Sequence, residues 1–558
     1  MLTLEGLAVS PGFAKGPIHI LQVADVSPAM RKTDDPTVEI ARAKDAISRT
    51  AQQLRQLHER AAESAGGEAA AIFEIHGLML EDEDFLDAIF QGIEVEQLCA
   101  EYSIYRAGKQ FFDLFACMDD DLMKERAADV HDLARRLLNT LTGNDTSLPK
   151  IAQPVVVAAE ELLPSQTIAL DKALVVAFLS RKGAMNSHAA ILARSLGIPA
   201  IVNLGEAFSS LKNGDVALVD GNKGSVVLQP AEDCLAAFEA QQQLCAQENR
   251  RLEALVDRPA ETSDGFTIEL CANIGRPDEL SAVMAANAEG IGLFRSEFLY
   301  LDANELPTEE LQFIAYKTAL QAMAPRRVVV RTLDLGADKN APCFQLETEG
   351  NPALGYRGIR ICLDRPDIFA PQLRALLRAS VYGRLGIMFP MITGPEELGL
   401  AYQALEQVKE DLAAEGVPFS KDIEYGIMVE TPAAVLMADQ LAPRVDFFSI
   451  GTNDLTQYTM AADRMNSRVS HLFQPGATAL LRAVYQVVLQ ARQAGIWVGI
   501  CGESAADLSL VPYYIGMGVD ELSMASHSIP KVKDAIRKLN KSDCKVALWE
   551  RLELPKSF

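Results

Sequence analysis

The sequence predicts a multidomain α/β protein: a C-terminal (β/α)8 TIM barrel, preceded by a small α/β domain that carries an inserted helical bundle. Three observations support this prediction. Short β-rich segments alternate with helical segments over roughly the last 300 residues, which is the pattern of a (β/α)8 barrel. A long stretch nearer the N-terminus has only helical periodicity. Short strands flank that stretch on both sides, which indicates that its helices are inserted into one small domain.

Length and composition limit the class of protein. The chain has 558 residues, of which 49% are hydrophobic and 23% charged, as in a globular protein with several domains. No apolar run approaches the roughly 20 residues that span a bilayer, and residues 1–16 lack the basic start and apolar core of a signal peptide. The nine cysteines are scattered singly, so we expect neither structural zinc nor disulfides, and a cytoplasmic location.

The net charge of −24 argues against nucleic acid and anionic membranes as partners. It favours a basic protein partner, although many soluble enzymes are simply acidic.

The N-terminal half is expected to contain two domains. Residues 1–25 and 145–230 form the small α/β domain, and residues 26–144 form the inserted bundle, whose apolar residues recur at i, i+3 and i+4. The small domain begins with a strand-like segment within 2–21. Its other predicted elements are strands at Val155–Ala159, Ala173–Leu179, Val216–Val219 and Ser225–Leu228 and a helix at Ala189–Leu196.

A helical linker over 231–258 then leads to the barrel, residues 259–558. The predicted barrel strands are Ile268–Ala272, Gly290–Phe294, Val328–Arg331, Gly386–Phe389, Tyr425–Val429, Phe447–Ile450, Trp497–Ile500 and Glu521–Met524.

Polar residues follow the ends of several of these strands. They are Arg295, Arg331, Glu430, the pair Asn453-Asp454, and Cys501, with Lys339 and Arg464 a little further along the chain. In such barrels the carboxyl ends of the strands form one rim, so these side chains are expected to converge there. Arginine suits phosphate or carboxylate groups, and a Glu/Asp pair suits Mg²⁺. A single arginine would more often be a surface ion-pair partner, but five or six charged residues at strand ends favour a site for an anion and a metal.

His188 lies at the start of the helix predicted in the small domain. Ser187 is expected to cap that helix and Gly197 to end it. Free backbone N–H groups at a helix start suit a phosphate, and histidine can carry a phosphoryl group covalently. On spacing alone, a capping or packing role for His188 is more common.

Longer motifs favour the phosphoryl-carrying role of His188 over a capping or packing role. The segment around His188 resembles the phosphohistidine signature of the PEP-utilising enzymes. Similar motifs of that family are Gly-Ile-Gly-Leu-Phe-Arg295-Ser-Glu-Phe, Val-Arg331-Thr-Leu-Asp334, Asn351-Pro-Ala-Leu-Gly355-Tyr-Arg357, Val-Glu430-Thr-Pro, Gly451-Thr-Asn453-Asp454-Leu-Thr-Gln-Tyr with Asp463-Arg464, and Cys501-Gly-Glu503. They occur in order from Ser10-Pro11-Gly12 to beyond Glu503. Within the family, the length and the helical insert resemble enzyme I of the sugar phosphotransferase system.

The resemblance implies an activity and a set of roles. Phosphoenolpyruvate would phosphorylate His188 on Nε2, in a small domain that swivels, and the phosphoryl group would pass to HPr or an HPr-like carrier protein, with pyruvate released. It implies Mg²⁺ as cofactor and a homodimer formed through the barrel. Substrate would be bound by Arg295, Arg331, Asn453, Asp454, Arg464, Arg357 and Lys339, and the metal by Glu430 and Asp454. Cys501 would protonate the enolate carbon, and the reference pKa of a thiol, near 8.5, leaves it largely protonated at neutral pH.

One loop departs from the enzyme I pattern. Enzyme I commonly reads Gly-Gly-Arg-Thr-Ser-His, whereas this chain reads Gly183-Ala184-Met185-Asn186-Ser187-His188, closer to pyruvate phosphate dikinase. A dikinase or phosphoenolpyruvate synthase is therefore the alternative enzyme, but the chain has no room for its nucleotide-binding module and no phosphate-binding Gly-x4-Gly-Lys-Ser/Thr loop. A non-catalytic phosphoenolpyruvate sensor is the alternative of another class.

The inserted bundle is strongly acidic. Residues 61–105 contain no Lys or Arg but include Glu81, Asp82, Glu83 and Asp84. Such a run is usually a solvated helical face, but the resemblance makes it the docking surface for HPr. Because His188 and the phosphoenolpyruvate site fall in different domains, we also expect a large domain movement with hinges at the ends of the linker.

Overall fold

The chain forms two compact units, Met1–Ala246 and Gln247–Phe558. The computed structural model describes residues 2–21, 28–65, 67–117, 121–143, 151, 153–162, 170, 173–183, 187–301, 303, 305–336, 343–344, 349–464, 466 and 468–553, and of His188 the backbone. Within these residues, no helix combines the length and the apolar character that crossing a membrane requires.

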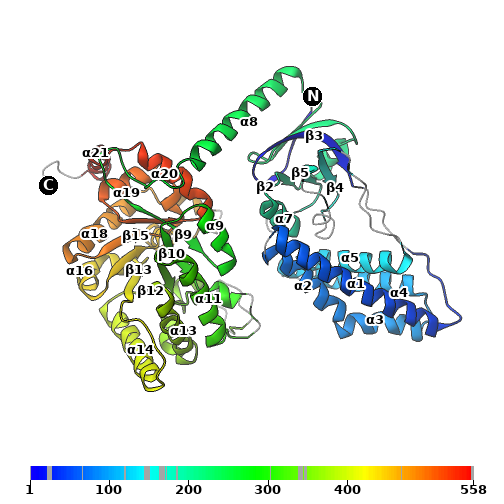
Figure 1. The fold of residues 1–558 in the computed structure, drawn as a ribbon, viewed down its shortest axis with the longest axis horizontal. Helices are drawn as coiled ribbons and strands as arrows, with labels where there is room; N and C mark the ends of the chain where they lie inside the picture. Colours follow the sequence, from blue (N-terminus) through cyan, green and yellow to red (C-terminus); the bar gives the residue numbers. More distant parts are fainter. Residues whose placement is uncertain are drawn as a thin grey trace. The chain divides into compact units, whose positions relative to one another are not determined.

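The first unit contains a mixed eight-stranded sheet in the order β1-β8-β7-β3-β4-β5-β6-β2 (Figure 1). Strands β3 to β6 run parallel to one another, and the outer pairs are antiparallel. The strands are β1 (Leu2–Glu5), β2 (Leu7–Ser10), β3 (Phe13–Ile20), β4 (Val155–Ala159), β5 (Val175–Ser180), β6 (Ala200–Val202), β7 (Val216–Asp220) and β8 (Ser225–Leu228).

The opening segment, which the sequence predicts to be strand-like with turns, is divided into three strands. Gly6 separates β1 from β2 at a point where a Cβ would come within 2.7 Å of the Ile201 side chain, so the backbone packs too closely for any larger residue. Pro11-Gly12 separates β2 from β3, with Gly12 at φ +130°. The three-residue strand β6 also went unpredicted, because so short a segment has no readable alternation.

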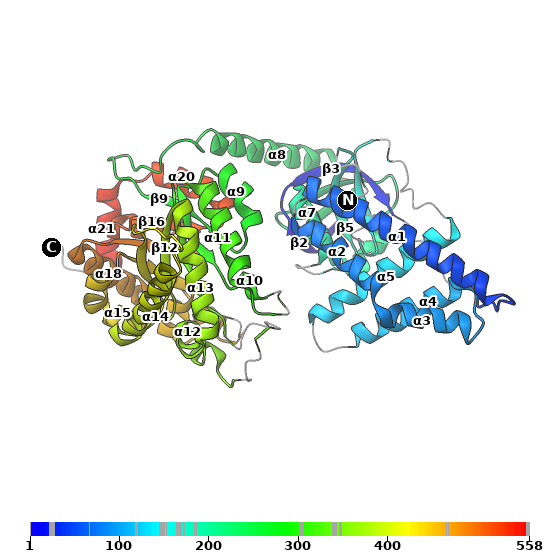
Figure 2. The same ribbon diagram turned by 60° about the horizontal axis from the view of Figure 1, so that its bottom comes forward.

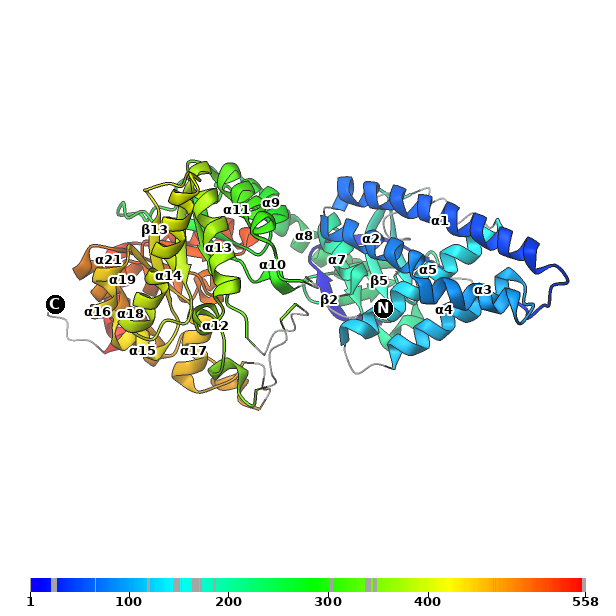
Figure 3. The ribbon, with the colours of Figure 1, turned by 90° about the horizontal axis from the view of Figure 1, so that it is seen from below.

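The helical bundle enters the chain between β3 and β4, as predicted, and Figures 2 and 3 show its long helices side by side. Its core is continuous with the small domain, because Leu192 of helix α7 is buried in the same apolar cluster as the bundle residues. The helices are α1 (Pro36–Ala65), α2 (Gly67–Glu81), α3 (Glu83–Glu94), α4 (Ala100–Ala116), α5 (Asp121–Thr142) and, in the small domain, α7 (His188–Leu196).

Helix α8 (Glu232–Glu253) is the predicted linker. Its N-terminal half is held within the first unit, where the rings of Phe13 and Phe238 lie 5.5 Å apart and Lys15 pairs with Glu239 at 2.9 Å. Its C-terminal end is held within the second unit, where Leu252 is buried and Arg251 pairs with Asp534.

The second unit is a closed parallel barrel of eight strands, β9 to β16, surrounded by helices. All eight strands lie within two residues of the predicted bounds. They are β9 (Glu269–Ile274), β10 (Gly290–Arg295), β11 (Arg327–Arg331), β12 (Arg384–Phe389), β13 (Glu424–Val429), β14 (Phe447–Ile450), β15 (Trp497–Ile500) and β16 (Glu521–Met524). The helices are α9 (Leu280–Ala285), α10 (Phe298–Leu301), α11 (Glu309–Met323), α12 (Ile359–Asp364), α13 (Pro366–Ala379), α14 (Pro395–Ala414), α15 (Pro432–Leu436), α16 (Ala438–Leu441), α17 (Thr452–Met460), α18 (Thr478–Ala494), α19 (Val511–Met517), α20 (Ile529–Arg537) and α21 (Lys541–Leu552).

Side chains fill the barrel at the amino ends of its strands. The rings of Phe447 and Trp497 are stacked 4.4 Å apart, and the Arg327 guanidinium lies 3.9 Å from the Trp497 ring. Arg327 also donates a hydrogen bond of 3.0 Å to the buried Glu521 carboxylate. This layer is the packed floor of the barrel.

Candidate active site

A cavity of about 870 Å³ opens at the carboxyl ends of the barrel strands. Because parallel strands all point to the same rim, residues far apart in the sequence meet there. The cavity is lined by eight of the predicted site residues, Arg295, Arg331, Arg357, Glu430, Asn453, Asp454, Arg464 and Cys501. Lys339 lies outside the described residues.

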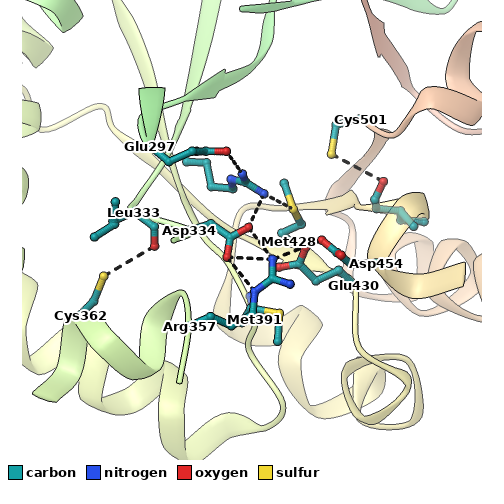
Figure 4. A network of polar contacts seen from close by, with 12 residues as sticks. Glu297, Leu333, Asp334, Arg357, Cys362, Met391, Met428, Glu430, Asp454 and Cys501 are labelled. Carbon is teal, nitrogen blue, oxygen red and sulfur yellow. Dashed lines mark hydrogen bonds and ion pairs between the residues drawn. The ribbon is translucent and has the colours of Figure 1, made fainter. Parts of the chain in front are cut away.

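Two arginines of the cavity are held by one buried carboxylate, as Figure 4 shows. Arg331 ends β11 and lies 2.9 Å from Asp334 through Nη1, while its Nη2 donates to Glu297. Arg357 donates to both oxygens of Asp334, at 2.9 and 3.1 Å through Nη2. All four side chains are largely buried. The guanidinium groups therefore occupy fixed positions before any substrate is bound.

Arg295 ends the neighbouring strand, β10, and presents a third guanidinium group to the cavity. Its charged group lies 4.6 Å from the Phe298 ring. Its Nε is buried and has no hydrogen-bond partner among the described residues. Because Arg295 lines the cavity, an anion bound there could supply an acceptor for this unused donor.

No role was predicted from the sequence for Glu297 or Asp334. Each follows a strand-ending arginine by two or three residues, as in Arg295-Ser-Glu297 and Arg331-Thr-Leu-Asp334. That spacing is the only signal that could have identified them, because their contacts are visible only in the fold.

Three carboxylates meet beside the arginines. The candidate ligand atoms of Asp334, Glu430 and Asp454 lie within 4.8 Å of one another. Glu430 is fully buried; its Oε1 accepts a hydrogen bond of 2.6 Å from the Met391 N–H, and its Oε2 has no hydrogen-bond partner among the described residues. Burial, and then the charges of Asp334 and Asp454, raise the pKa of Glu430 well above its usual value, while Arg331 and Arg357 oppose that shift. A buried carboxylate with a free oxygen and two acidic neighbours fits a hard divalent cation.

Asn453 and Asp454 lie on the first turn of α17, immediately after β14. Asn453 exchanges two hydrogen bonds with Glu503 of the next βα loop: its Nδ2 donates to Oε1 at 3.4 Å, and its Oδ1 accepts from the Glu503 N–H at 3.3 Å. These bonds join two loops across the rim, while Arg464 is exposed at its edge.

Cys501 follows β15 and is 4% exposed. Its Sγ lies 3.6 Å from the Ile450 carbonyl oxygen, to which it can donate a weak hydrogen bond. Burial raises the pKa of the Cys501 thiol to about 12. Because the shift is upward, the thiol keeps its proton across the neutral range and can act as a proton donor, not as a thiolate nucleophile.

This protonation state predicts slow alkylation of Cys501. At pH 8 a thiol of pKa about 12 is thiolate in only about 10⁻⁴ of molecules, against roughly a quarter for a thiol of reference pKa. We expect iodoacetamide to modify Cys501 at least about 100-fold more slowly than the exposed Cys117, and to do so faster as the pH rises toward 10. Peptide mass spectrometry over a time course measures both rates. Equal rates at pH 8 would contradict a protonated, buried thiol.

His188 occupies the predicted position in the first unit. It is the first residue of α7, whose Ser187 cap accepts a hydrogen bond from the Ala190 N–H at 3.4 Å, and the helix ends at Gly197 with φ +66°. Both capping predictions are confirmed. The His188 imidazole and residues 184–186 lie outside the described part of the structure.

Known families match almost the whole chain. The N-terminal domain of PEP-utilising enzymes matches residues 5–126, their mobile domain matches 151–224, and their PEP-binding domain matches 249–541. These ranges correspond in turn to the first strands with most of the bundle, to the rest of the small domain, and to the barrel.

Curated relatives match over nearly their full length. The chain is 45% identical over 542 residues to the phosphoenolpyruvate-protein phosphotransferase of Geobacillus stearothermophilus, covering 97% of this chain and 94% of that one. It is 43% identical over 543 residues to the enzyme of the same name from Staphylococcus carnosus, and 42% identical over 544 residues to that of Bacillus subtilis. In both comparisons 97% of this chain and 95% of the relative are covered.

Proposed function

This chain belongs to the phosphoenolpyruvate-protein phosphotransferases of the PEP-utilising enzyme family, and from that premise we propose that His188 carries the phosphoryl group to the histidine of HPr or an HPr-like protein. This would be the first step of a sugar phosphotransferase system. The observation that carries the proposal is the barrel cavity, where four arginines, the carboxylates Glu430 and Asp454, and a protonated thiol converge.

The arginines bind and orient the substrate. Phosphoenolpyruvate has a phosphate and a carboxylate, and the forked donors of Arg295, Arg331 and Arg357 suit both groups. Asn453 and Arg464 add donors at the rim. Phosphoryl transfer depends mainly on alignment and on neutralising charge, and the fixed guanidinium groups of Arg331 and Arg357 supply both without rearranging.

Glu430 and Asp454 would hold Mg²⁺, for which the free Oε2 of Glu430 is placed. When bound, the ion would supply positive charge beside the transferring phosphate. The two carboxylates need to be ionised for this role, and the raised pKa of Glu430 makes metal binding favour higher pH.

Cys501 would complete the product. Loss of the phosphoryl group leaves the enolate of pyruvate, whose methylene carbon needs one proton. The Cys501 thiol holds that proton at neutral pH and lines the same cavity as the arginines. Its proton moves to carbon, pyruvate forms, and the thiolate is reprotonated from solvent.

His188 would receive the phosphoryl group at the start of α7, where N–H groups without helical partners and the positive end of the helix dipole favour a phosphate. Residues 1–25 and 145–230 are accordingly the phosphohistidine domain in this proposal, and residues 26–144 the HPr-binding domain. Carrier and substrate belong to different compact units, and the same histidine must also reach HPr docked on the helical bundle, so the proposal includes a change in the relative position of the units during turnover. A homodimer formed through the barrel is part of the same proposal.

A direct assay tests the proposed function. The purified chain, phosphoenolpyruvate and Mg²⁺ should yield pyruvate and a phosphoprotein that is labile in acid and stable in base, as phosphohistidine is. Adding HPr-like proteins one at a time should then discharge the phosphoprotein. Pyruvate formation without a phosphoprotein, or a need for nucleotide, would refute the proposal.

The proposed docking surface combines charge with a small apolar groove. Glu81, Asp82, Glu83 and Asp84 are all exposed where α2 meets α3. Beside them is a groove of about 230 Å³. Its lining includes Leu78, Met79, Asp82, Phe85, Phe111 and Phe115. A basic partner would be steered by the carboxylates and could place an apolar side chain in the groove.

Charge reversal tests this surface. Asp82 is best left unchanged, because its side chain caps α3 by accepting a hydrogen bond of 3.0 Å from the Phe85 N–H. Changing Glu81, Glu83 and Asp84 to lysine should lower the rate of transfer to HPr by about 10-fold or more at low salt. The rate of phosphorylation by phosphoenolpyruvate should stay unchanged.

The matched control reverses three exposed acids of the barrel helix α14, Glu406, Glu410 and Asp411. It produces the same change in net charge and should leave transfer to HPr within about twofold of the unmodified rate. Stopped-flow transfer kinetics over a range of salt concentrations measure both variants. Equal rates for the two would place docking elsewhere.

A further inference from the structure

Asp334 makes more contacts with the substrate arginines than any other carboxylate shown in Figure 4. It lies three residues beyond the end of β11 and is 1% exposed. Its Oδ1 accepts from Nε and Nη2 of Arg357, at 3.3 and 3.1 Å. Its Oδ2 accepts from Arg357 Nη2 at 2.9 Å and lies 2.9 Å from Arg331 Nη1. One carboxylate therefore holds two guanidinium groups at once.

These contacts decide between two roles for Asp334. Its position near Glu430 and Asp454 would allow it to be a third metal ligand. However, a carboxylate has about four acceptor positions, and two arginine donors lie at each of its oxygens. Glu430 differs, because its buried Oε2 has no partner among the described residues. The free acceptor that a metal requires is on Glu430, whereas Asp334 is occupied by the arginines.

Two buried guanidinium groups side by side repel each other unless an anion lies between them. Glu297 accepts a hydrogen bond from Arg331, and Asp454 is 3.5 Å from Arg357 at the cavity edge. Asp334 is bonded to both arginines, at 2.9 Å in each case. Removing its charge would leave two like charges in a poorly solvated site without the anion that joins them.

We propose that Asp334 is a positioning residue, which holds Arg331 and Arg357 in place for the phosphate of the substrate and does not bind the metal. The inference rests on the proposed function, since it concerns the same cavity. It goes further by giving different roles to two carboxylates that each follow a barrel strand. Glu430 acts on the metal, and Asp334 acts only through arginines.

Asp334→Asn tests this role, because it keeps the shape and removes the charge. Binding is measured by calorimetry with phosphoenolpyruvate and Mg²⁺ in a His188→Ala background of the full chain, where no transfer should follow. The Kd for phosphoenolpyruvate should rise at least tenfold. The Mg²⁺ concentration that half-saturates the protein at saturating phosphoenolpyruvate should change less than twofold. A tenfold rise in that concentration would make Asp334 a metal ligand and overturn the proposal.

A double-mutant cycle separates positioning from a merely structural role. Asp334→Asn raises the Kd for phosphoenolpyruvate by some factor when Arg357 is present. If Asp334 acts through Arg357, that factor should be at least threefold smaller in an Arg357→Gln background. A purely structural loss would weaken binding by the same factor in both. Asp334→Glu keeps the charge and should weaken binding less than Asp334→Asn, which keeps the test valid should the asparagine variant fold poorly.

The control is Asp367→Asn, the same change in an exposed aspartate that pairs with Arg365 at 2.7 Å. It should leave all these constants within twofold. An unchanged Kd in Asp334→Asn, with normal binding by the parent, would overturn the positioning role alone. No binding of phosphoenolpyruvate by the parent chain would instead refute the proposed function.

Discussion

Replacing His188 with alanine should abolish phosphorylation by phosphoenolpyruvate, lowering its rate by at least about 10⁴-fold, because a covalent carrier has no substitute. The chain contains seven histidines, and only His188 begins a helix capped as α7 is. The measurement is incorporation of ³²P from labelled phosphoenolpyruvate. The variant should remain folded, since the cap is supplied by Ser187 and not by the histidine.

His131→Ala is the matched control, since His131 lies on helix α5 of the same unit and is exposed. It should incorporate phosphate at the unmodified rate. Incorporation of ³²P into the His188→Ala variant would contradict the assignment of His188 as the carrier. His527 also lines the barrel cavity, so label found there by peptide mapping would move the carrier into the barrel and remove the need for the units to approach.

Changing Glu430 to glutamine should lower phosphorylation of the protein by at least about 10³-fold, since the variant lacks the negative charge and the free oxygen that would hold the metal. Asp454→Asn should act similarly. Excess Mg²⁺ should rescue neither variant fully. The exposed Glu410, changed to glutamine, is the control and should have no effect.

Cys501→Ala should behave differently from both carboxylate variants. The arginines and carboxylates remain, so phosphoenolpyruvate should bind normally and His188 should still be phosphorylated. Release of pyruvate should become slow, because the enolate loses its proton donor. Single-turnover measurements that follow the phosphoprotein and pyruvate separately distinguish the two steps. A Cys501→Ala variant that lost substrate binding but kept normal turnover would make the thiol a packing residue.

The barrel could be predicted from sequence because its strands are short, mostly apolar segments separated by helical segments. The rim residues could be predicted because they lie at or directly after the ends of those strands. Asp334 could not be assigned, because its partner Arg357 is 23 residues away along the chain. The pKa of Cys501 could not be predicted either: the reference value near 8.5 holds for an exposed thiol, and only the fold shows the burial that raises it to about 12. Contacts and burial are properties of packing, which no local pattern encodes.

The stacked floor of the barrel has a consequence for the order of events. Phe447, Trp497 and Arg327 fill the amino end of the barrel, so the cavity of the described structure communicates with solvent through the carboxyl-end rim. In the proposed reaction substrate, the carrier histidine and pyruvate would all use that one entrance. While the histidine occupies it, neither exchange of phosphoenolpyruvate nor escape of pyruvate can occur. Pyruvate departure would therefore have to wait for withdrawal of the phosphorylated histidine. Each turnover would follow a compulsory order in which substrate enters first, the histidine second, and pyruvate leaves last.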